Sequence, residues 1–329
     1  MKTFLVFALL CLATVVLVML ELASGPSSIA VIEGIADALA GTRSVAGIII
    51  AEIRLPRALL AMLTGASLAL AGAAMQGLLR NPLASPDILG VSQTAGLFAV
   101  LTIYYGVADL HWVLLPLAAI TGAAVAVTLM LQIARKFAGT ATIILCGIAI
   151  SAIAGSLIAL SLNLAPNPLA LQEIYYWMLG SVANRSMQEV WIALPFMLVS
   201  WTILLGKRHF HDALTLGENT AQTLGFELRR ETLFVIAGAA GCTGAAVAVS
   251  GNIGFVGLVV PHIMRPLAGN EPGKLMFLSL PAGAVLVLLA DVLVQHLPGT
   301  QQLQLGVLTA ALGGPFFLYL LIRQKVGTQ

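Results

Sequence analysis

The chain has 329 residues, of which 59% are hydrophobic and 9% are charged, and its mean hydropathy is +1.00. Soluble proteins carry about 25% charged residues, because a globule needs a charged exterior to stay in water. This composition excludes a soluble globular domain, a nucleic-acid-binding protein and a disordered chain. The apolar runs are long and continuous, which predicts an all-α polytopic membrane protein.

A hydrocarbon core about 30 Å thick needs roughly 20 helical residues. The sequence predicts about ten spans within a single transmembrane domain, residues 1–329, at 3–22, 58–79, 88–107, 112–134, 141–163, 189–206, 232–250, 256–268, 275–296 and 305–323. The first resembles a secretory signal but is longer, so we expect a retained helix. The eighth is too short to cross unaided and should lie within protein or beside a water-filled cavity.

The basic residues favour one orientation. With a cytoplasmic N-terminus, four of the 16 Lys and Arg residues lie outside, namely Arg43, Arg54, Arg57 and Arg185. The rest lie in inner loops or at inner helix ends, as the positive-inside rule expects. Both termini are therefore predicted to be cytoplasmic.

Small residues recur in the second span at Gly65, Ala69, Ala73 and Gly77. This spacing predicts a smooth helix face that another backbone can approach closely. The triplet Gly72-Ala73-Ala74 is echoed by Gly244-Ala245-Ala246 in the seventh span. Because these spans are expected to run in opposite directions, an inverted repeat is one interpretation, although the echo is weak.

Two arginines, Arg54 and Arg57, flank Leu55-Pro56 at the outer side of the second span. They could be interface anchors or charges balanced by Glu52. Alternatively, they could dock an acidic partner outside the membrane. The residues alone leave these interpretations open.

Two stretches rich in Gly and Pro are expected to shape the backbone. In the turn from Arg80 to Gly90 the prolines end one helix, and Ser85 or Asp87 can cap the next. The second stretch leads into the eighth span, where a lone His is more typical of a hydrogen-bonded structural residue than of a ligand. The residues concerned are Asn81, Pro82, Pro86, Gly254, Gly257, Pro261 and His262. The scattered Cys and His residues predict no metal site.

The longest inner hydrophilic loop covers residues 207–231 and holds ten ionisable side chains. Apolar residues interrupt it, and two glycines divide it, which predicts two short helices at an angle. The loop is either a solvated connector or an amphipathic element presented to a cytoplasmic partner. Its informative residues are Leu214, Leu216, Gly217, Glu218, Ala221, Leu224, Gly225 and Phe226.

The sequence resembles the iron-siderophore, haem and vitamin B12 importer permeases of bacterial ATP-binding-cassette (ABC) systems. The resemblance covers almost the whole chain, and the Gly-Phe-Val-Gly-Leu-Val-Val-Pro-His run is its most specific part. The matching stretches are Arg54–Arg57, Asn81–Gly90, Leu216–Gly225, Gly254–Arg265, Ala290-Asp291, Gly306–Ala310 and Pro315–Phe317.

The resemblance implies a type II ABC importer permease fold and a set of partners. A second permease subunit, identical or different, would complete a central path in the bacterial cytoplasmic membrane. Two cytoplasmic ATP-binding subunits would hold ATP and Mg, so this chain would bind no cofactor itself. A periplasmic or lipid-anchored substrate-binding protein would deliver the metal chelate.

The resemblance also implies roles for individual residues. The 207–231 loop would couple the permease to the ATPase, and Arg54 and Arg57 would meet acidic residues of the binding protein. The third docking arginine of the family falls at Gln295, beside His296, so this contact is in question. The cytoplasmic constriction of the path maps near Thr140, Ala141 and Thr142. Asn252 and Gln304 stand where the family usually has Pro.

Other classes of function fit less well. The chain has no Gly-x-x-x-x-Gly-Lys-Ser/Thr phosphate loop, so we expect a non-catalytic subunit whose partner hydrolyses ATP. An ion-coupled transporter usually keeps acids in mid-membrane. Here the other carboxylates fall in loops or at span ends, and Asp291, which lies inside a span, is expected to bond between helices. A membrane hydrolase would need clustered acids or histidines, but the five His residues are scattered.

The cargo follows from the resemblance only as a class. A ferric siderophore is the expected substrate, with haem and vitamin B12 as alternatives within the same family. The binding protein performs most of the selection, so the residues of the permease need not encode the cargo.

Overall fold

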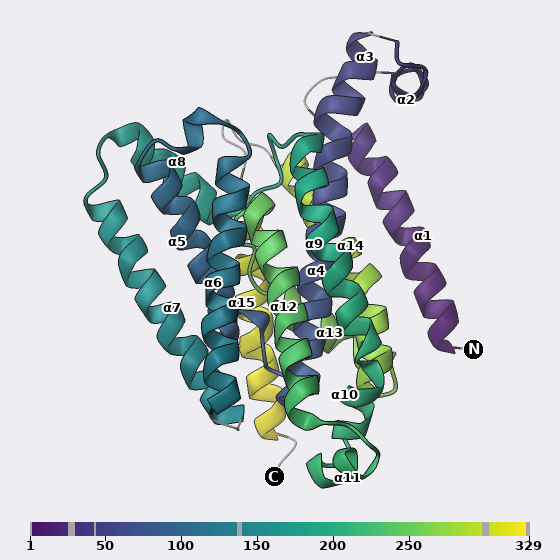
Figure 1. Ribbon diagram of the computed structural model, residues 1–329. Coiled ribbons are helices and arrows are strands. Elements are labelled where there is room, and N and C mark those ends of the chain that lie inside the picture. Colours follow the sequence, from purple (N-terminus) through teal and green to yellow (C-terminus); the bar gives the residue numbers. More distant parts are fainter. Residues whose placement is uncertain (1, 26–29, 43, 137–139, 298–302, 327–329) are drawn as a thin grey trace.

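The computed structural model describes residues 2–25, 30–42, 44–136, 140–297 and 303–326, and within these ranges the regular elements are helices (Figure 1). A helix occupies each of the ten predicted spans. Their bounds are α1 (Lys2–Ala23), α4 (Leu55–Leu78), α5 (Val91–Tyr104), α6 (Leu114–Lys136), α7 (Thr140–Asn163), α9 (Met187–Gly206), α12 (Leu228–Ser250), α13 (Val256–Met264), α14 (Pro272–His296) and α15 (Leu305–Val326).

These helices differ in their capacity to cross a membrane. In the described part of the chain, seven are long and apolar enough, so the estimate of about ten spans is not exact. Helix α5 and the Leu305–Tyr319 part of α15 are shorter apolar helices. Helix α13 has nine residues and includes Pro261, and it packs against α4, α14 and α15. The prediction of a short eighth span enclosed by protein is therefore confirmed.

Some elements were not predicted from the sequence. Helices α2 (Val31–Ala40) and α3 (Val45–Ile48) precede α4, and a π-helical stretch, η1 (Ile49–Arg54), joins α3 to α4. The second span is therefore continuous from Val45 to Leu78. Helix α8 (Pro168–Leu179) was missed because it is short and carries polar residues, although Asn167 caps its first turn.

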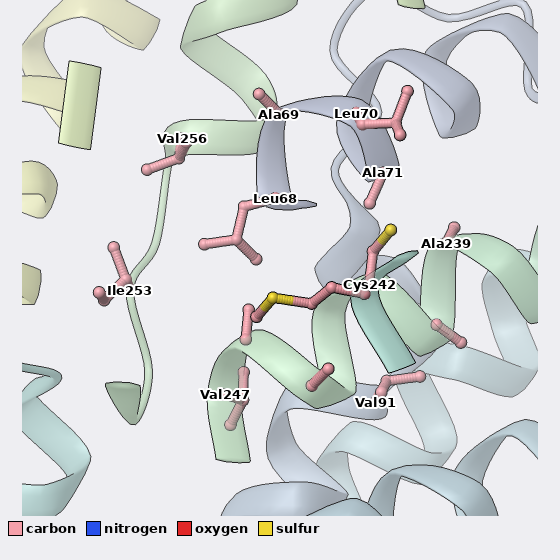
Figure 2. Packing of buried hydrophobic residues seen from close by; sticks show 14 of the residues in the cluster. Leu68, Ala69, Leu70, Ala71, Val91, Ala239, Cys242, Val247, Ile253 and Val256 are labelled. Atoms are coloured by element: carbon pink, nitrogen blue, oxygen red, sulfur yellow. The ribbon is translucent and has the colours of Figure 1, made fainter. Parts of the chain in front are cut away.

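Helix α4 is the centre of the bundle. Within the described residues, 89% of its most apolar stretch is buried, compared with 6% for α1. It packs against α14, α12, α13 and α9, whereas α1 and α7 lie at opposite edges (Figure 1). Figure 2 shows part of this core, with Leu68–Ala71 of α4 close to side chains of α12 and the start of α13. The exposed apolar faces of α1 and α7 are suited to lipid or to another subunit.

Glycine contacts explain how α4 can be so deeply buried. A Cβ on Gly65 would overlap the carbonyl oxygen of Gly283 in α14, and a Cβ on Gly72 would overlap that of Gly257 in α13. The helices therefore meet backbone to backbone. Gly65 and Ala69 of the predicted face both meet Gly283, which confirms that part of the face, whereas Gly77 meets the side chain of His211.

The bundle has two ends. We call the end with α3 and α8 the upper end, and the end with α10 (Arg208–Leu214) and α11 (Glu218–Thr223) the lower end (Figure 1). Helices α4 and α12 pack together and run in opposite directions. This arrangement matches the directions expected for an inverted repeat, which itself stays a prediction.

Candidate functional sites at the two ends of the bundle

At the upper end, Arg57 of α4 forms a two-pronged ion pair with Asp291 of α14. Its Nε lies 2.7 Å from Asp291 Oδ2, and its Nη2 lies 3.0 Å from Asp291 Oδ1. Glu21 of α1 adds a second carboxylate 3.4 Å from Nε, and both acids are buried. The prediction that Asp291 bonds between helices is confirmed.

Arg54 and Gln295 complete this cluster. Arg54 is buried, and its Nη1 donates a 2.7 Å hydrogen bond to the carbonyl oxygen of Leu22. The side-chain amide of Gln295 donates to Glu21, so it links α14 to α1. The ring of the neighbouring His296 lies 2.8 Å from the carbonyl oxygen of Val292.

The arginines predicted to dock a partner thus lie inside the protein in this structure. Arg54 holds the end of α1, and Arg57 binds Asp291. A docking contact by Arg57 would have to share or replace the Asp291 carboxylate. The docking role of Arg54, Arg57 and Gln295 stays a prediction, and Arg43 lies outside the described residues.

A cavity of about 810 Å³ opens beside this cluster at the upper end. It lies between α8, the segment 181–185, the end of α14 and the start of α15, and its walls include Arg57, Asp291 and Arg185. Polar side chains line part of it. The predictions from the sequence did not include this site, because its residues are far apart along the chain.

At the lower end, the turn after α4 is held by local hydrogen bonds. Asn81 Oδ1 accepts a 2.9 Å bond from the backbone N–H of Leu83. Ser85 caps the short helix η2 (Pro86–Leu89), and Asp87 accepts a 2.7 Å bond from the hydroxyl of Ser92. The turn predicted here is confirmed, but the predicted cap differs: Ser85 caps η2, whereas α5 begins at Gly90 without a side-chain cap.

The 207–231 loop folds as predicted, with α10 and α11 as two short helices. Leu214 and Ala221 are buried, and Phe226 packs on Phe210 with ring centroids 5.7 Å apart. Gly217 precedes α11 with a φ of 101°, a backbone conformation that favours glycine. The glycines therefore allow the sharp change of direction that the sequence indicated.

Polar contacts attach this two-helix element to the bundle. Lys207 pairs with Glu231 at 2.8 Å and so joins the two ends of the loop. Asp212 Oδ1 accepts a 2.8 Å bond from the backbone N–H of Gly273 at the start of α14. Sequence reasoning missed this role of Asp212. Because α10 is attached to α14 through Asp212 and packs against α4, a force on α10 would pass directly to these membrane helices.

The outer surface of the element carries exposed apolar side chains. Leu216 and Leu224 are 64% and 59% exposed, although they lie in a polar loop. Glu218 forms an exposed 2.6 Å ion pair with Arg80 of the preceding turn. Exposed leucines next to charges are typical of a surface that a protein partner covers.

His211 is fully buried within α10, and neither ring nitrogen has a hydrogen-bond partner among the described residues. It fills the space left by Gly77 of α4. Burial lowers the pKa of His211 from 6.5 to about 4. The ring is therefore neutral at physiological pH.

We expect this histidine to make the fold sensitive to acid. Below pH 6.5 the His211 ring is protonated in the unfolded chain, whereas in the folded chain it stays neutral down to about pH 4. The contribution of His211 to the free energy of unfolding is therefore fully present above pH 6.5. It falls by up to about 3 kcal/mol as the pH is lowered to about 4. His211→Leu should remove this part of the loss in unfolding measured from pH 7 to pH 4.5. The exposed His209→Leu control should retain it, and an identical pH profile for both variants would contradict the assignment.

Helix α13 and its approach contain the remaining motif residues. A Cβ on Gly257 would lie 2.8 Å from the carbonyl oxygen of Leu68, so this glycine permits contact with α4. Pro261 is buried, whereas Gly254 has open space around it. His262 packs edge-on against Phe316 with ring centroids 5.9 Å apart. The hydrogen bond expected for His262 is absent at Nδ1, as far as the described residues show.

The residues predicted to form the cytoplasmic constriction begin α7. Thr140 is the first residue of this helix, and Ala141 and Thr142 follow in its first turn. The preceding residues 137–139 lie outside the described part of the chain. The gate role of these three residues stays a prediction.

The fold and both ends together define a class of protein. A bundle of apolar helices with a polar cavity at one end and a fastened helix pair at the other is typical of a membrane permease. Residues 13–323 match the FecCD transport family, so the chain belongs to this family.

Known proteins support this assignment. The chain is 38% identical to the Fe(3+)-citrate import system permease protein YfmE of Bacillus subtilis, over 83% of this chain and 81% of the relative. It is 34% identical to the vitamin B12 import system permease protein BtuC of Citrobacter koseri, over 83% of each chain. A solved inward-facing structure of an ABC transporter described as metal-chelate type matches with a TM-score of 0.85 at 28% identity, covering 96% of this chain and 98% of the other.

Proposed function

We propose that this chain is the permease subunit of an ABC importer that moves a ferric chelate, such as a ferric siderophore, from the periplasm into the cytoplasm. The observation that carries the proposal is the α10–α11 element. It presents Leu216 and Leu224 outward, while Asp212 and the buried face of α10 attach it to the bundle. This geometry suits the transfer of motion from a cytoplasmic ATPase.

The proposed mechanism is alternating access without covalent chemistry. Two ATP-binding subunits close on ATP and move the α10–α11 element, and the glycine-rich helix contacts around α4 then repack. A second permease subunit, identical or different, completes the path. The chain lies in the bacterial inner membrane with both termini in the cytoplasm, which places the lower end inside.

The upper end then faces the substrate-binding protein, which is periplasmic or lipid-anchored. Arg54 and Arg57 are proposed to contribute to docking, and the start of α7 at Thr140–Thr142 to the cytoplasmic constriction. Because Arg57 is bound to Asp291, an acidic residue of the binding protein would compete for the same guanidinium.

The relatives support a metal chelate as the cargo. Their names include an Fe(3+)-citrate system and a vitamin B12 system. Haem or vitamin B12 is the alternative within the same class. Growth of a deletion strain on ferric citrate, a ferric siderophore, haem and cobalamin distinguishes these cargoes. Loss of growth on the ferric chelates alone is expected.

An energy-coupling test separates this function from an ion-coupled transporter. We expect uptake of the radiolabelled ferric chelate to stop when ATP is depleted and to continue when an ionophore collapses the proton gradient. The reverse pattern would overturn the ABC importer assignment.

The α10–α11 element gives a more specific prediction. Leu216→Asp together with Leu224→Asp should lower transport per ATP hydrolysed by about tenfold, because an anchoring apolar side chain contributes more than about 1 kcal/mol at an interface. The measurement compares uptake and ATP hydrolysis by the complex in liposomes.

Two further variants make this test selective. Asn219→Asp adds a charge on the exposed surface of α11 without removing a leucine, and it should transport normally. Ala221→Pro should disrupt α11 and uncouple transport, because proline breaks a helix interior. Normal coupling in the double leucine variant would contradict the role of this surface.

A further inference from the structure

The upper cavity contains an arginine that forms no ion pair within the described residues, although the charge of Glu189 acts on it from a distance. Arg185 lines the cavity just before α9, and its buried Nε has no hydrogen-bond partner among the described residues. Burial lowers its pKa, which reflects the cost of keeping this charge away from water. A buried guanidinium nitrogen without a hydrogen-bond partner is unusual, because its desolvation penalty is only partly offset.

The nearest acid along the chain is already engaged. Glu189 lies one turn beyond Arg185, but its Oε2 accepts a 2.9 Å bond from the backbone N–H of Ser186 and a second bond from the Ser186 hydroxyl. These bonds form the capping box of α9. The carboxylate is therefore bonded to Ser186 and forms no direct contact with the guanidinium, although its charge partly offsets the burial of Arg185.

The other charges of the cavity wall do not neutralise Arg185. Asp291 lies in the same wall but binds Arg57 through both oxygens. Glu173 of α8 has a pKa raised by burial and then by Asp109, so its ionised form is disfavoured. In the described wall, Arg185 is thus the cation that a ligand can reach without breaking an existing ion pair.

The remaining polar groups suit a ligand that accepts hydrogen bonds. The side chains of Gln172, Tyr176, Asn184 and Gln304 line the same cavity and can donate hydrogen bonds. Its volume of about 810 Å³ is within the range of small-molecule sites, roughly 300–1,000 Å³. Trp177 and the nearby leucines supply an apolar surface.

We propose that this cavity is a binding site for a carboxylate-bearing metal chelate, with Arg185 holding one carboxylate. A guanidinium and a carboxylate can form two parallel hydrogen bonds, which are stronger when water is excluded. The inference rests on the proposed import function and adds a ligand class to it. Ferric citrate is the natural probe, because it carries carboxylates.

The test is equilibrium dialysis of ferric [14C]citrate against the purified full chain in phospholipid nanodiscs. We expect Arg185→Gln to weaken binding by about tenfold or more, because it removes a charge-assisted, bidentate contact. Arg185→Lys keeps the charge but loses the paired N–H donors of the guanidinium. Its affinity for ferric citrate should therefore lie between those of the wild type and Arg185→Gln. Lys274→Gln, a surface charge change at the lower end, should bind like the wild type.

A stability measurement separates binding from folding. Because Arg185 forms no ion pair within the described residues, Arg185→Gln should unfold at the same temperature as the wild type or higher. Equal citrate affinity in the wild type and Arg185→Gln, or no binding by the wild type, would overturn the inference. Loss of affinity only alongside a lower unfolding temperature would also overturn it.

A further ligand tests whether the carboxylate belongs to a chelate or to a docked protein. N-acetylglutamate represents an acidic side chain of a docked protein, and tighter binding of it than of ferric citrate would overturn the chelate assignment. If the proposed import function were wrong, chelate uptake in whole cells would continue after ATP depletion. That measurement does not depend on the affinities measured in nanodiscs.

Discussion

Asp291→Ala should destabilise the chain by about 3–5 kcal/mol, the usual cost of removing one member of a buried ion pair. Arg57 would keep its charge but lose both bonds to Asp291, at 2.7 Å and 3.0 Å. The remaining Glu21 contact, at 3.4 Å, cannot replace them. Reversible unfolding in mixed micelles, followed by tryptophan fluorescence, measures the effect.

A charge exchange tests whether the pair itself is responsible. Arg57→Asp combined with Asp291→Arg should recover part of the lost stability, because opposite charges again face each other across α4 and α14. Glu271→Ala removes one member of an exposed pair with Lys274 and should cost less than about 1 kcal/mol. Equal effects of Asp291→Ala and Glu271→Ala would show that the upper pair does not hold the helices together.

Gly72→Ala should have a similarly large effect, although it adds only one methyl group. Its Cβ would overlap the backbone carbonyl of Gly257, which cannot rotate away as a side chain could. Helices α4 and α13 would have to separate, with a cost of about 3 kcal/mol or more, at the upper limit for overpacked cores. Thermal unfolding should show the loss, and transport should fall with it.

The matched control is Gly206→Ala at the end of α9. A Cβ there has open space around it, so the substitution should change stability by about 1 kcal/mol or less. A Gly72→Ala variant as stable as Gly206→Ala would mean that α4 and α13 can move apart freely, contrary to the close packing seen here.

Much of the fold could be predicted because membrane helices are local features. The apolar runs located the helices, and the glycine and leucine pattern of 207–231 indicated α10 and α11. The four-residue spacing of Gly65, Ala69, Ala73 and Gly77 indicated a contact face within a single helix. Each of these inferences depends on residues that are neighbours along the chain.

The contacts in the candidate sites could not be predicted in this way, because they join residues that are far apart along the chain. Arg57 and Asp291 are 234 positions apart, and no local pattern reveals which of several partners an arginine will choose. The outward docking role assigned to Arg54 and Arg57 took no account of Glu21 or of the carbonyl of Leu22. The Ser186-x-x-Glu189 pattern could have indicated the capping box next to Arg185, but it does not show that Arg185 faces a cavity.

The sequence by itself determined that this is a helical membrane protein, where ten of its helices lie, apart from the early start of the second span at Val45, and which faces are small enough for close contact. Those properties follow from hydropathy and helical periodicity, which act within a few turns. Only the tertiary structure decided that α4 is enclosed, that Arg57 is bound to Asp291 and that Arg185 lines a cavity with no hydrogen-bond partner at its buried Nε among the described residues. These outcomes depend on which helices meet, because charges in a low-dielectric interior pair with whatever group the packing brings within reach.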